Sequence, residues 1–377
     1  MKNNYFTGVI NTESDFSKSE IRTILDYDLI DLLSLIKKIN MEQKIHEITY
    51  SKNIFLPLTH ICKNNCGYCT FKQSPEEATF LLMNKQDVFK QLHEANKYNC
   101  SEALFTFGES ADEIDVVKEK LNDYGYDSMV DYVYDLSKVS LNKYNVLPHT
   151  NMGIINRDQI HKLKKVNASM GLMLETTNKH LLKTIVHKDS PGKNPDKRLK
   201  LIENAGKEKV PFTTGLLIGI GETREDHLDS LFKIRQLQDK YGHIQEIIIQ
   251  NFKPKLGIPM EEYPEPPLID LIKLTLASHI LFPDISIQIP PNLNRKLMSI
   301  FAIVGADDIG GISPITKDYV NPDAPWPKIE ELKLELDSIN YSLVERLPVY
   351  NKYINRTFLS PLVYDKVVQI KKEYKIR

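Results

Sequence analysis

Eight short apolar runs recur along the chain, and charged stretches with helical periodicity separate them. The runs span residues 53–59, 103–109, 145–153, 169–176, 211–222, 246–252, 286–291 and 303–312. Most of them are apolar throughout, as expected of parallel strands that are covered on both faces. Alternating strands and helices predict parallel β–α units, and eight such units predict an α/β fold, a closed (β/α)8 barrel of the TIM type.

Polar or glycine-rich residues stand at the end of each run. In chain order they are Thr59 leading to Cys62, Gly108 with Glu109, His149 to Asn151, Glu175 with Thr176, Gly219 to Glu222, Gln250 with Asn251, Asn292, and Asp307 with Asp308. In a β/α barrel the functional groups gather at the carboxyl ends of the strands. An open Rossmann-type sheet also binds ligands at strand ends, but usually at one switch point. Polar ends on all eight runs therefore favour the barrel.

The segments on either side of the barrel are expected to be helical. Residues 17–48 carry apolar side chains at helical spacing, so residues 1–48 are predicted to form an N-terminal helical extension. The barrel is predicted over residues 49–325. Residues 326–377 are predicted to form helices and loops that pack on its outside.

The overall composition excludes several classes of function. Among the 377 residues 41% are hydrophobic and 26% charged, as in an ordinary soluble globular protein, and the formal net charge is −1. This balance predicts no nucleic-acid partner and no anionic membrane surface as a partner. The chain has no apolar run of about 18 residues and its start lacks the apolar core of a signal peptide, so we expect a cytoplasmic location.

Three of the four cysteines, Cys62, Cys66 and Cys69, lie within eight residues. A disulfide framework would spread its cysteines out, so the cluster predicts a metal site in a reducing compartment. Three thiolates on one loop can bind three irons of a [4Fe-4S] cluster and leave the fourth iron open for a ligand. A zinc site usually takes four ligands, and here His60 or Cys100 is the candidate fourth. A non-catalytic zinc or iron–sulfur protein is therefore an alternative interpretation.

The spacing Cys-x3-Cys-x2-Cys after a first strand resembles the radical S-adenosylmethionine superfamily. The resemblance implies a [4Fe-4S] cluster whose open iron binds the methionyl amine and carboxylate of S-adenosylmethionine. It also implies a cofactor role for five residues, namely Tyr68 against the adenine, Gly108 and Glu109 at the ammonium, Glu175 at the ribose and Arg198 at the carboxylate. In a barrel, the glycine motif at residues 215–222 favours a close backbone approach to the adenine, which makes Gly219 and Glu222 further cofactor candidates. Phe107 stands where the superfamily usually has a first glycine. Glu222 has a second interpretation as the cap of a helix that begins near Thr223.

Motifs along nearly the whole chain resemble one family in this superfamily, the CofG subunit of 7,8-didemethyl-8-hydroxy-5-deazariboflavin synthase. The motifs lie at residues 55–59, 66–71, 102–106, 147–151, 169–175, 211–222, 242–252, 290–293, 308–314, 321–322 and 326–327. The resemblance implies that a partner enzyme, CofH, joins a tyrosine-derived hydroxybenzyl group to 5-amino-6-ribitylaminouracil. A chain of the CofG type, supplied by a low-potential electron donor, then closes the central ring of this adduct. A deoxyadenosyl radical removes a hydrogen, ammonia leaves, and the product is Fo, the deazaflavin core of coenzyme F-420.

Several strand-end residues suit such a substrate, which carries a pyrimidinedione, a ribityl chain and a phenol. Four amides can each donate and accept hydrogen bonds and are the candidate substrate ligands: Asn151, Gln250, Asn251 and Asn292. Asp307 or Asp308 is a candidate to hold ribityl hydroxyls or to accept a proton, and His149 is a candidate acid or base for ring closure. A different radical enzyme of the tyrosine lyase or menaquinone branch is the second alternative.

Overall fold

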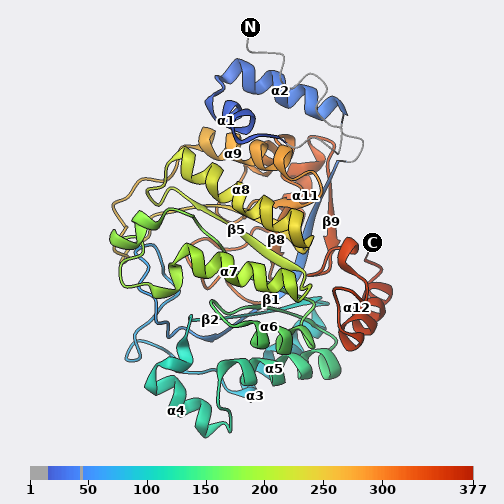
Figure 1. Cartoon of the computed structure of the whole chain (residues 1–377). Coiled ribbons are helices and arrows are strands. Elements are labelled where there is room, and N and C mark those ends of the chain that lie inside the picture. Colours follow the sequence, from blue (N-terminus) through green and yellow to red (C-terminus); the bar gives the residue numbers. More distant parts are fainter. Residues whose placement is uncertain (1–15, 43–45, 377) are drawn as a thin grey trace.

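A closed barrel of eight parallel strands forms the centre of the computed structural model, which describes residues 16–42 and 46–376 (Figure 1). The strands are β1 (Glu47–Thr59), β2 (Glu102–Phe107), β3 (Leu147–Asn151), β4 (Ser169–Gly171), β5 (Phe212–Ile218), β6 (Ile244–Asn251), β7 (Ser286–Gln288) and β8 (Asp308–Ile312). Each strand pairs with the next, and β1 pairs with both β2 and β8, which closes the barrel. The predicted TIM-type barrel is confirmed.

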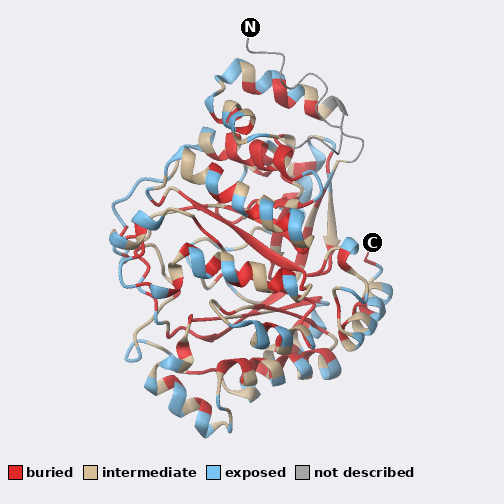
Figure 2. Ribbon diagram, in the orientation of Figure 1, coloured by how far each residue is buried: buried red, intermediate tan, exposed pale blue. Residues whose placement is uncertain are grey.

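Helices surround the strands and cover their outer faces (Figure 2). They are α3 (Lys85–Lys97), α4 (Asp115–Asp123), α5 (Met129–Val139), α6 (Arg157–Lys164), α7 (Pro195–Lys207), α8 (Arg224–Tyr241), α9 (Leu268–Leu281) and α10 (Met298–Ile303). Their ends follow from local chemistry. In α8, Thr223 and Asp226 form a capping box at the start, and Gly242 ends the helix with a φ of 62°. Such stops return the chain to the next strand.

The N-terminal segment forms two helices, α1 (Lys18–Asp26) and α2 (Leu29–Glu42). Helix α1 packs against α8 and α9 on the outside of the barrel, as Figure 1 shows. Its buried face consists of Ile21, Ile24 and Leu25. Helices α1 and α2 lie within the predicted helical stretch over residues 17–48, but its last two residues belong to β1. Residues 1–15 and 43–45 of the predicted extension lie outside the described residues.

The C-terminal segment contains a strand that the sequence did not predict. Helices α11 (Ile329–Asp337) and α12 (Pro361–Glu373) are present as expected, but β9 (Ser342–Arg346) lies between them. Strand β9 runs parallel to the first five residues of β1, whereas β2 pairs with β1 only from Asn53 onward. The start of β1 extends beyond β2 and leaves backbone groups to be paired, and β9 pairs with them.

The last strand of the barrel also begins later than predicted. The apolar run over residues 303–312 predicts one strand, but Ile303 ends α10 and the chain turns at Gly305, where φ is 104°. Short apolar runs do not distinguish a buried helix end from a strand. As a result Asp307 and Asp308 lie at the amino end of β8, and not at its carboxyl end.

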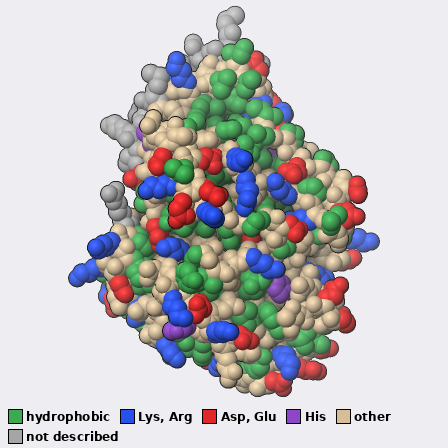
Figure 3. Space-filling view, turned by 180° about the vertical axis from the view of Figure 1, so that it is seen from behind, with side chains coloured by type: hydrophobic (Ala, Val, Ile, Leu, Met, Phe, Trp, Pro, Cys, Tyr) green, Lys and Arg blue, Asp and Glu red, His purple; other side chains and the backbone are tan. Residues whose placement is uncertain are grey.

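The surface carries charges of both signs. On the face shown in Figure 3, lysine and arginine side chains are interspersed with aspartate and glutamate. Within residues 16–42 and 46–376 no helix has the length and apolar character to cross a membrane.

Candidate functional site

Two adjoining cavities lie inside the barrel and are called here the outer and the inner cavity. The outer cavity has a volume of about 340 Å³ and lies at the carboxyl ends of the strands, where the cysteine loop follows β1. The inner cavity, of about 190 Å³, reaches toward the amino ends, where Ser51, Glu102 and Glu246 line it. The two cavities share wall residues, among them Asn151 and Gln250. The outer and the inner cavity are therefore connected inside the barrel.

All three clustered cysteines line the outer cavity, and none forms a disulfide. The backbone N–H of Glu109 donates a hydrogen bond to Cys62 Sγ at 3.2 Å. Burial raises the pKa of the Cys66 thiol to about 11, so this thiol stays protonated until a metal displaces the proton. In the described part of the chain no three His, Cys, Asp or Glu side chains converge on one ion. A cubane needs no such convergence, because each of its irons takes a separate thiolate, and three cysteines on one loop fit it.

The turn after β2 packs tightly against the cysteine loop. A Cβ atom on Gly108 would lie 1.9 Å from the carbonyl oxygen of Ile61, so only glycine fits this approach. The backbone N–H of Gly108 donates to Thr59 O at 3.0 Å, and the N–H of Lys63 donates to Glu109 O at 3.0 Å. These contacts fix Glu109 beside the cysteines.

Glu109 is buried and receives hydrogen bonds from two side chains. Arg198 Nη1 lies 3.2 Å from Glu109 Oε2, and Asn64 Nδ2 donates to the same oxygen at 3.0 Å. Arg198, in the first turn of α7, also donates to Met173 O at 2.7 Å and to Gly192 O at 2.9 Å. A carboxylate and a guanidinium therefore face the outer cavity as a preformed pair.

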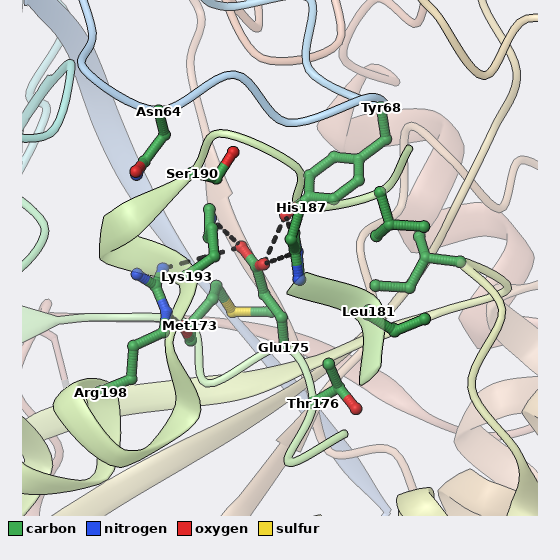
Figure 4. Close-up of polar contacts among 12 residues, drawn as sticks. Asn64, Tyr68, Met173, Glu175, Thr176, Leu181, His187, Ser190, Lys193 and Arg198 are labelled. Carbon is green, nitrogen blue, oxygen red and sulfur yellow. Dashed lines mark hydrogen bonds and ion pairs between the residues drawn. The ribbon is translucent and has the colours of Figure 1, made fainter. Parts of the chain in front are cut away.

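Glu175 is the centre of a second polar cluster (Figure 4). Its carboxylate accepts hydrogen bonds from Tyr68 and Lys193, and His187 Nε2 lies 3.2 Å from Oε2. The Tyr68 hydroxyl lies 3.1 Å from the same His187 nitrogen. Arg198 Nη2 lies 3.7 Å from Oε1, which links this cluster to Glu109.

Charge and backbone geometry both mark Glu175. Burial alone would raise the pKa of its carboxyl, but the charges of Lys193 and Arg198 and the hydrogen bond from His187 hold that pKa well below its usual range. The residue has a φ of 67°, in the left-handed region that side chains rarely adopt. Its backbone is held there because its N–H donates to Gly215 O at 2.8 Å. Conformations of this kind cluster at functional sites.

The structure does not bring Gly219 and Glu222 to the outer cavity. The Glu222 carboxylate accepts hydrogen bonds from the N–H groups of Gly219 at 2.5 Å and Ile220 at 2.8 Å, and His227 Nε2 lies 2.8 Å away. It therefore braces the turn between β5 and α8. Leu217, within the same motif, lines the outer cavity instead.

The predicted substrate ligands lie on the cavity walls. Asn151 and Gln250 belong to both cavities, Asn251 to the outer one and Asn292 to the inner one. Two of these amides also hold loops, since Asn292 Nδ2 donates to Asp318 at 2.8 Å and Asn251 Oδ1 accepts from Asn294 at 2.8 Å.

His149 lines the inner cavity from β3. Its Nδ1 lies 2.7 Å from Ser169 Oγ, and its Nε2 lies 3.1 Å from Asn151 Oδ1. Burial lowers the pKa of the imidazole, so the ring is neutral near pH 7. A neutral ring held in this way can accept or pass on a proton.

Asp307 and Asp308 do not line either cavity. Asp308 is buried and paired with Arg346, and Asp307 accepts a hydrogen bond from the N–H of Ile287 at 2.8 Å. Burial and the neighbouring Asp308 charge raise the pKa of Asp307 to about 7. Their placement follows from the late start of β8.

Several residues at the site were not predicted from the sequence, among them Lys193, His187 and Arg346. Lys193 and His187 come from loops between β4 and α7, and Arg346 comes from β9. Lys193 lines the outer cavity and Arg346 the inner one, whereas His187 contacts Glu175. No strand-end rule locates a loop residue, and the short run Ser342–Arg346 has only two adjacent apolar residues to indicate a strand.

Known proteins resemble this chain in sequence and in fold. Residues 56–234 match the family model of the radical SAM superfamily. Among solved structures, the [FeFe]-hydrogenase maturase HydG from Carboxydothermus hydrogenoformans is similar, with a TM-score of 0.71, 17% identity, and coverage of 95% of this chain and 87% of that one. Methylornithine synthase PylB gives a TM-score of 0.66 at 16% identity, over 87% and 94% of the two chains. These structures share the fold.

Curated relatives are much closer in sequence. The 7,8-didemethyl-8-hydroxy-5-deazariboflavin synthase of Methanothermobacter thermautotrophicus is 54% identical over 86% of this chain and 98% of its own length. The enzyme of the same name from Methanocaldococcus jannaschii is 52% identical over 90% and 94% of the two chains. With this identity over nearly the full length of the relatives, the chain belongs to the 7,8-didemethyl-8-hydroxy-5-deazariboflavin synthase family of radical SAM enzymes.

Proposed function

We propose that this protein forms Fo, 7,8-didemethyl-8-hydroxy-5-deazariboflavin, from 5-amino-5-(4-hydroxybenzyl)-6-(D-ribitylimino)-5,6-dihydrouracil with loss of ammonia. The observation that carries the proposal is the outer cavity, where three free cysteines lie beside two buried ion pairs, Arg198 with Glu109 and Lys193 with Glu175. Relatives with this name share about half of the sequence.

The outer cavity suits an amino acid cofactor that carries both charges. Cys62, Cys66 and Cys69 would hold a [4Fe-4S] cluster. With S-adenosylmethionine bound, that cluster supplies a 5′-deoxyadenosyl radical. The Glu109 carboxylate would bind the methionyl ammonium, and Arg198 would bind the carboxylate, because opposite charges form the strongest hydrogen bonds.

The second pair would bind the nucleoside part of the cofactor. Glu175 has two oxygens that can accept from the two ribose hydroxyls, and its low pKa keeps both of them as acceptors. Lys193 contacts Glu175 and lies 5.8 Å from the centroid of the Tyr68 ring. Tyr68 would lie against the adenine, with Leu217 on the cavity wall nearby.

The substrate would lie where the two cavities meet. Asn151 and Gln250 belong to both walls, so they can hold the pyrimidinedione between the cofactor and the inner cavity. His149 would act as the acid or base during ring closure. Asn251 would orient the substrate from the wall of the outer cavity and Asn292 from the wall of the inner cavity. Enclosure within the barrel would protect a carbon radical from solvent.

Two partners follow from this chemistry. The adduct would come from a CofH enzyme, either within a stable complex or by transfer. The cluster would take its electron from a low-potential donor.

Anaerobic incubation of the cluster-loaded protein with synthetic adduct, reductant and S-adenosylmethionine tests the proposal. We expect a fluorescent deazaflavin product and release of 5′-deoxyadenosine, and neither from the Cys66→Ala variant. Release of 5′-deoxyadenosine without Fo would point to another substrate, as in the tyrosine lyase or menaquinone branch. No release at all would contradict the radical mechanism.

A further inference from the structure

The inner cavity is polar where a barrel of this type is normally filled by apolar side chains. The interior of a TIM barrel usually consists of layers of Val, Ile and Leu. Here the polar residues that line the cavity from the amino halves of the strands are Ser51, Asn53, Glu102, His149, Thr213 and Glu246. Burying polar groups in this way costs stability wherever their hydrogen bonds are incomplete, as at the side-chain oxygen of Asn53.

The C-terminal segment closes the floor of this cavity. Arg346 and Pro348 line it, and Pro348 O accepts hydrogen bonds from Ser169 Oγ at 2.7 Å and Gln245 Nε2 at 3.0 Å. The Tyr350 hydroxyl donates to Glu246 at 3.0 Å. A ligand that enters from the outer cavity therefore meets a closed, hydrogen-bonded end.

The floor has no free positive charge. Among the described residues that line the inner cavity, Arg346 is the one Lys or Arg. Its guanidinium is already bound to Asp308 at two points and lies 2.7 Å from Glu246 Oε1. An arginine matched by two carboxyls has little attraction left for an anionic ligand.

Glu102 adds a carboxylate that no cation balances. It is 6% exposed, and its Oε2 accepts a hydrogen bond from the Ser51 hydroxyl. In the described part of the chain no lysine, arginine or histidine forms an ion pair with it. The outer cavity differs, since Lys193, Arg198 and Lys255 all line it.

Hydroxyl groups are the ligands that this floor can satisfy. A carboxylate accepts from hydroxyls, and an amide or a neutral imidazole can exchange either kind of hydrogen bond with them. The buried side-chain oxygen of Asn53 has no partner within the described structure, so it can accept another hydrogen bond. A phosphate would bring two negative charges to a cavity that already holds Glu102.

From this arrangement we infer that the inner cavity binds the ribityl chain of the substrate and that Glu102 excludes substrates with a phosphate ester at the end of that chain. The inference rests on the proposed function and assigns an orientation to the substrate: the ribityl group lies toward the amino ends of the strands, and the hydroxybenzyl group lies toward the cofactor. Glu102 is thus a specificity-determining residue.

The test uses the product Fo and its 5′-phosphate ester as probes, because Fo is fluorescent and unreactive. Each is titrated anaerobically into the cluster-loaded protein with S-adenosylmethionine and without reductant, and binding is followed by fluorescence anisotropy. We expect Fo to bind at least about tenfold more tightly than its phosphate, because like charges oppose each other in a buried site. In Glu102→Gln the ratio of the two dissociation constants, phosphate ester over Fo, should fall at least about threefold, because the phosphate ester binds more tightly.

Glu345→Gln is the matched control, because Glu345 lies next to Arg346 on β9 but pairs with Lys52 and does not line the cavity. The control should keep the ratio of the unmodified protein. Should Glu102→Gln fail to fold, Asn53→Asp adds a carboxylate to the lining of the same cavity and should instead increase the preference for Fo over its phosphate. Equal affinities for the two probes, or no Fo binding by a preparation that forms Fo from the adduct, would overturn the inference. Fo formation itself would still support the proposed function.

Discussion

Arg346 on β9 and Asp308 on β8 form a two-point ion pair beneath the inner cavity, with Nε 2.5 Å from Oδ2 and Nη2 2.8 Å from Oδ1. Both side chains are buried, and Arg346 reaches Glu246 as well. The last strand is therefore connected to the barrel by charge as well as by backbone pairing.

Replacing Arg346 should destabilise the fold strongly. The substitution Arg346→Met leaves Asp308 and Glu246 buried without their cation, and breaking a buried pair in this way costs about 3–5 kcal/mol. Urea unfolding measures the loss. Arg356→Met is the control, because Arg356 pairs with Asp365 on the exposed surface and should cost less than about 1 kcal/mol. Similar losses in the two variants would contradict the role given to Arg346.

Stability should also depend on the protonation of Glu246. Burial raises the pKa of its carboxyl from 4.5 to about 8, although Arg346 opposes the shift, so the folded state binds the proton more tightly than the unfolded chain. The stabilisation from this proton is complete below pH 4.5 and is lost as the pH rises toward 8. Glu246→Gln should make stability less dependent on pH in this interval, as measured by urea midpoints. An unchanged dependence of the urea midpoint on pH would show that Glu246 does not hold the proton.

Loss of one clustered cysteine should abolish the metal site. In Cys66→Ala only two thiols remain on the loop, so we expect iron content and the reduced cluster's electron paramagnetic resonance signal to fall to background. Cys100 is buried elsewhere, beside β2, and Cys100→Ala should retain both signals. Retention of the cluster in the Cys66 variant would mean that another residue supplies the ligand.

Lys193 should contribute to cofactor affinity. Its ammonium contacts Glu175 within the outer cavity and helps to keep that carboxyl ionised. Lys193→Met should therefore weaken the charge-assisted hydrogen bond that Glu175 would accept from the ribose, which is worth about 1.5–3 kcal/mol. This corresponds to a loss of about tenfold or more in S-adenosylmethionine affinity, measured by equilibrium dialysis of the cluster-loaded protein. Lys188 is exposed on the same loop, and Lys188→Met should bind normally. Equal affinity of both variants for S-adenosylmethionine would show that Lys193 does not contribute to cofactor binding.

The sequence predicted the barrel because the alternation of an apolar run with a helical stretch occurs eight times. An error in the bounds of one run does not change this alternation. It also located Glu109, Glu175 and the cysteine loop, since each directly follows a buried apolar run and the barrel brings such ends to one mouth. The prediction was wrong for the start of β8, where the end of α10 is as apolar as a strand.

Arg346 and Lys193 could not be placed in the same way. Strand β9 has five residues and only two adjacent apolar side chains, Leu343 and Val344, so its pairing with β1 is a tertiary effect. Lys193 lies in a short 3₁₀ turn whose position depends on contacts such as the hydrogen bond from Gly192 N–H to Asn64. Local patterns carry no information on such contacts.

The pairing of β9 with β1 joins residues that lie almost three hundred positions apart in the chain. During synthesis the backbone groups at the start of β1 therefore lack their β9 partners until nearly the entire polypeptide has been made. Only then can Arg346 bind Glu246 and Pro348 bind Gln245, and these contacts close the floor of the inner cavity. The pocket that would select the substrate is therefore among the last parts of the molecule to be assembled.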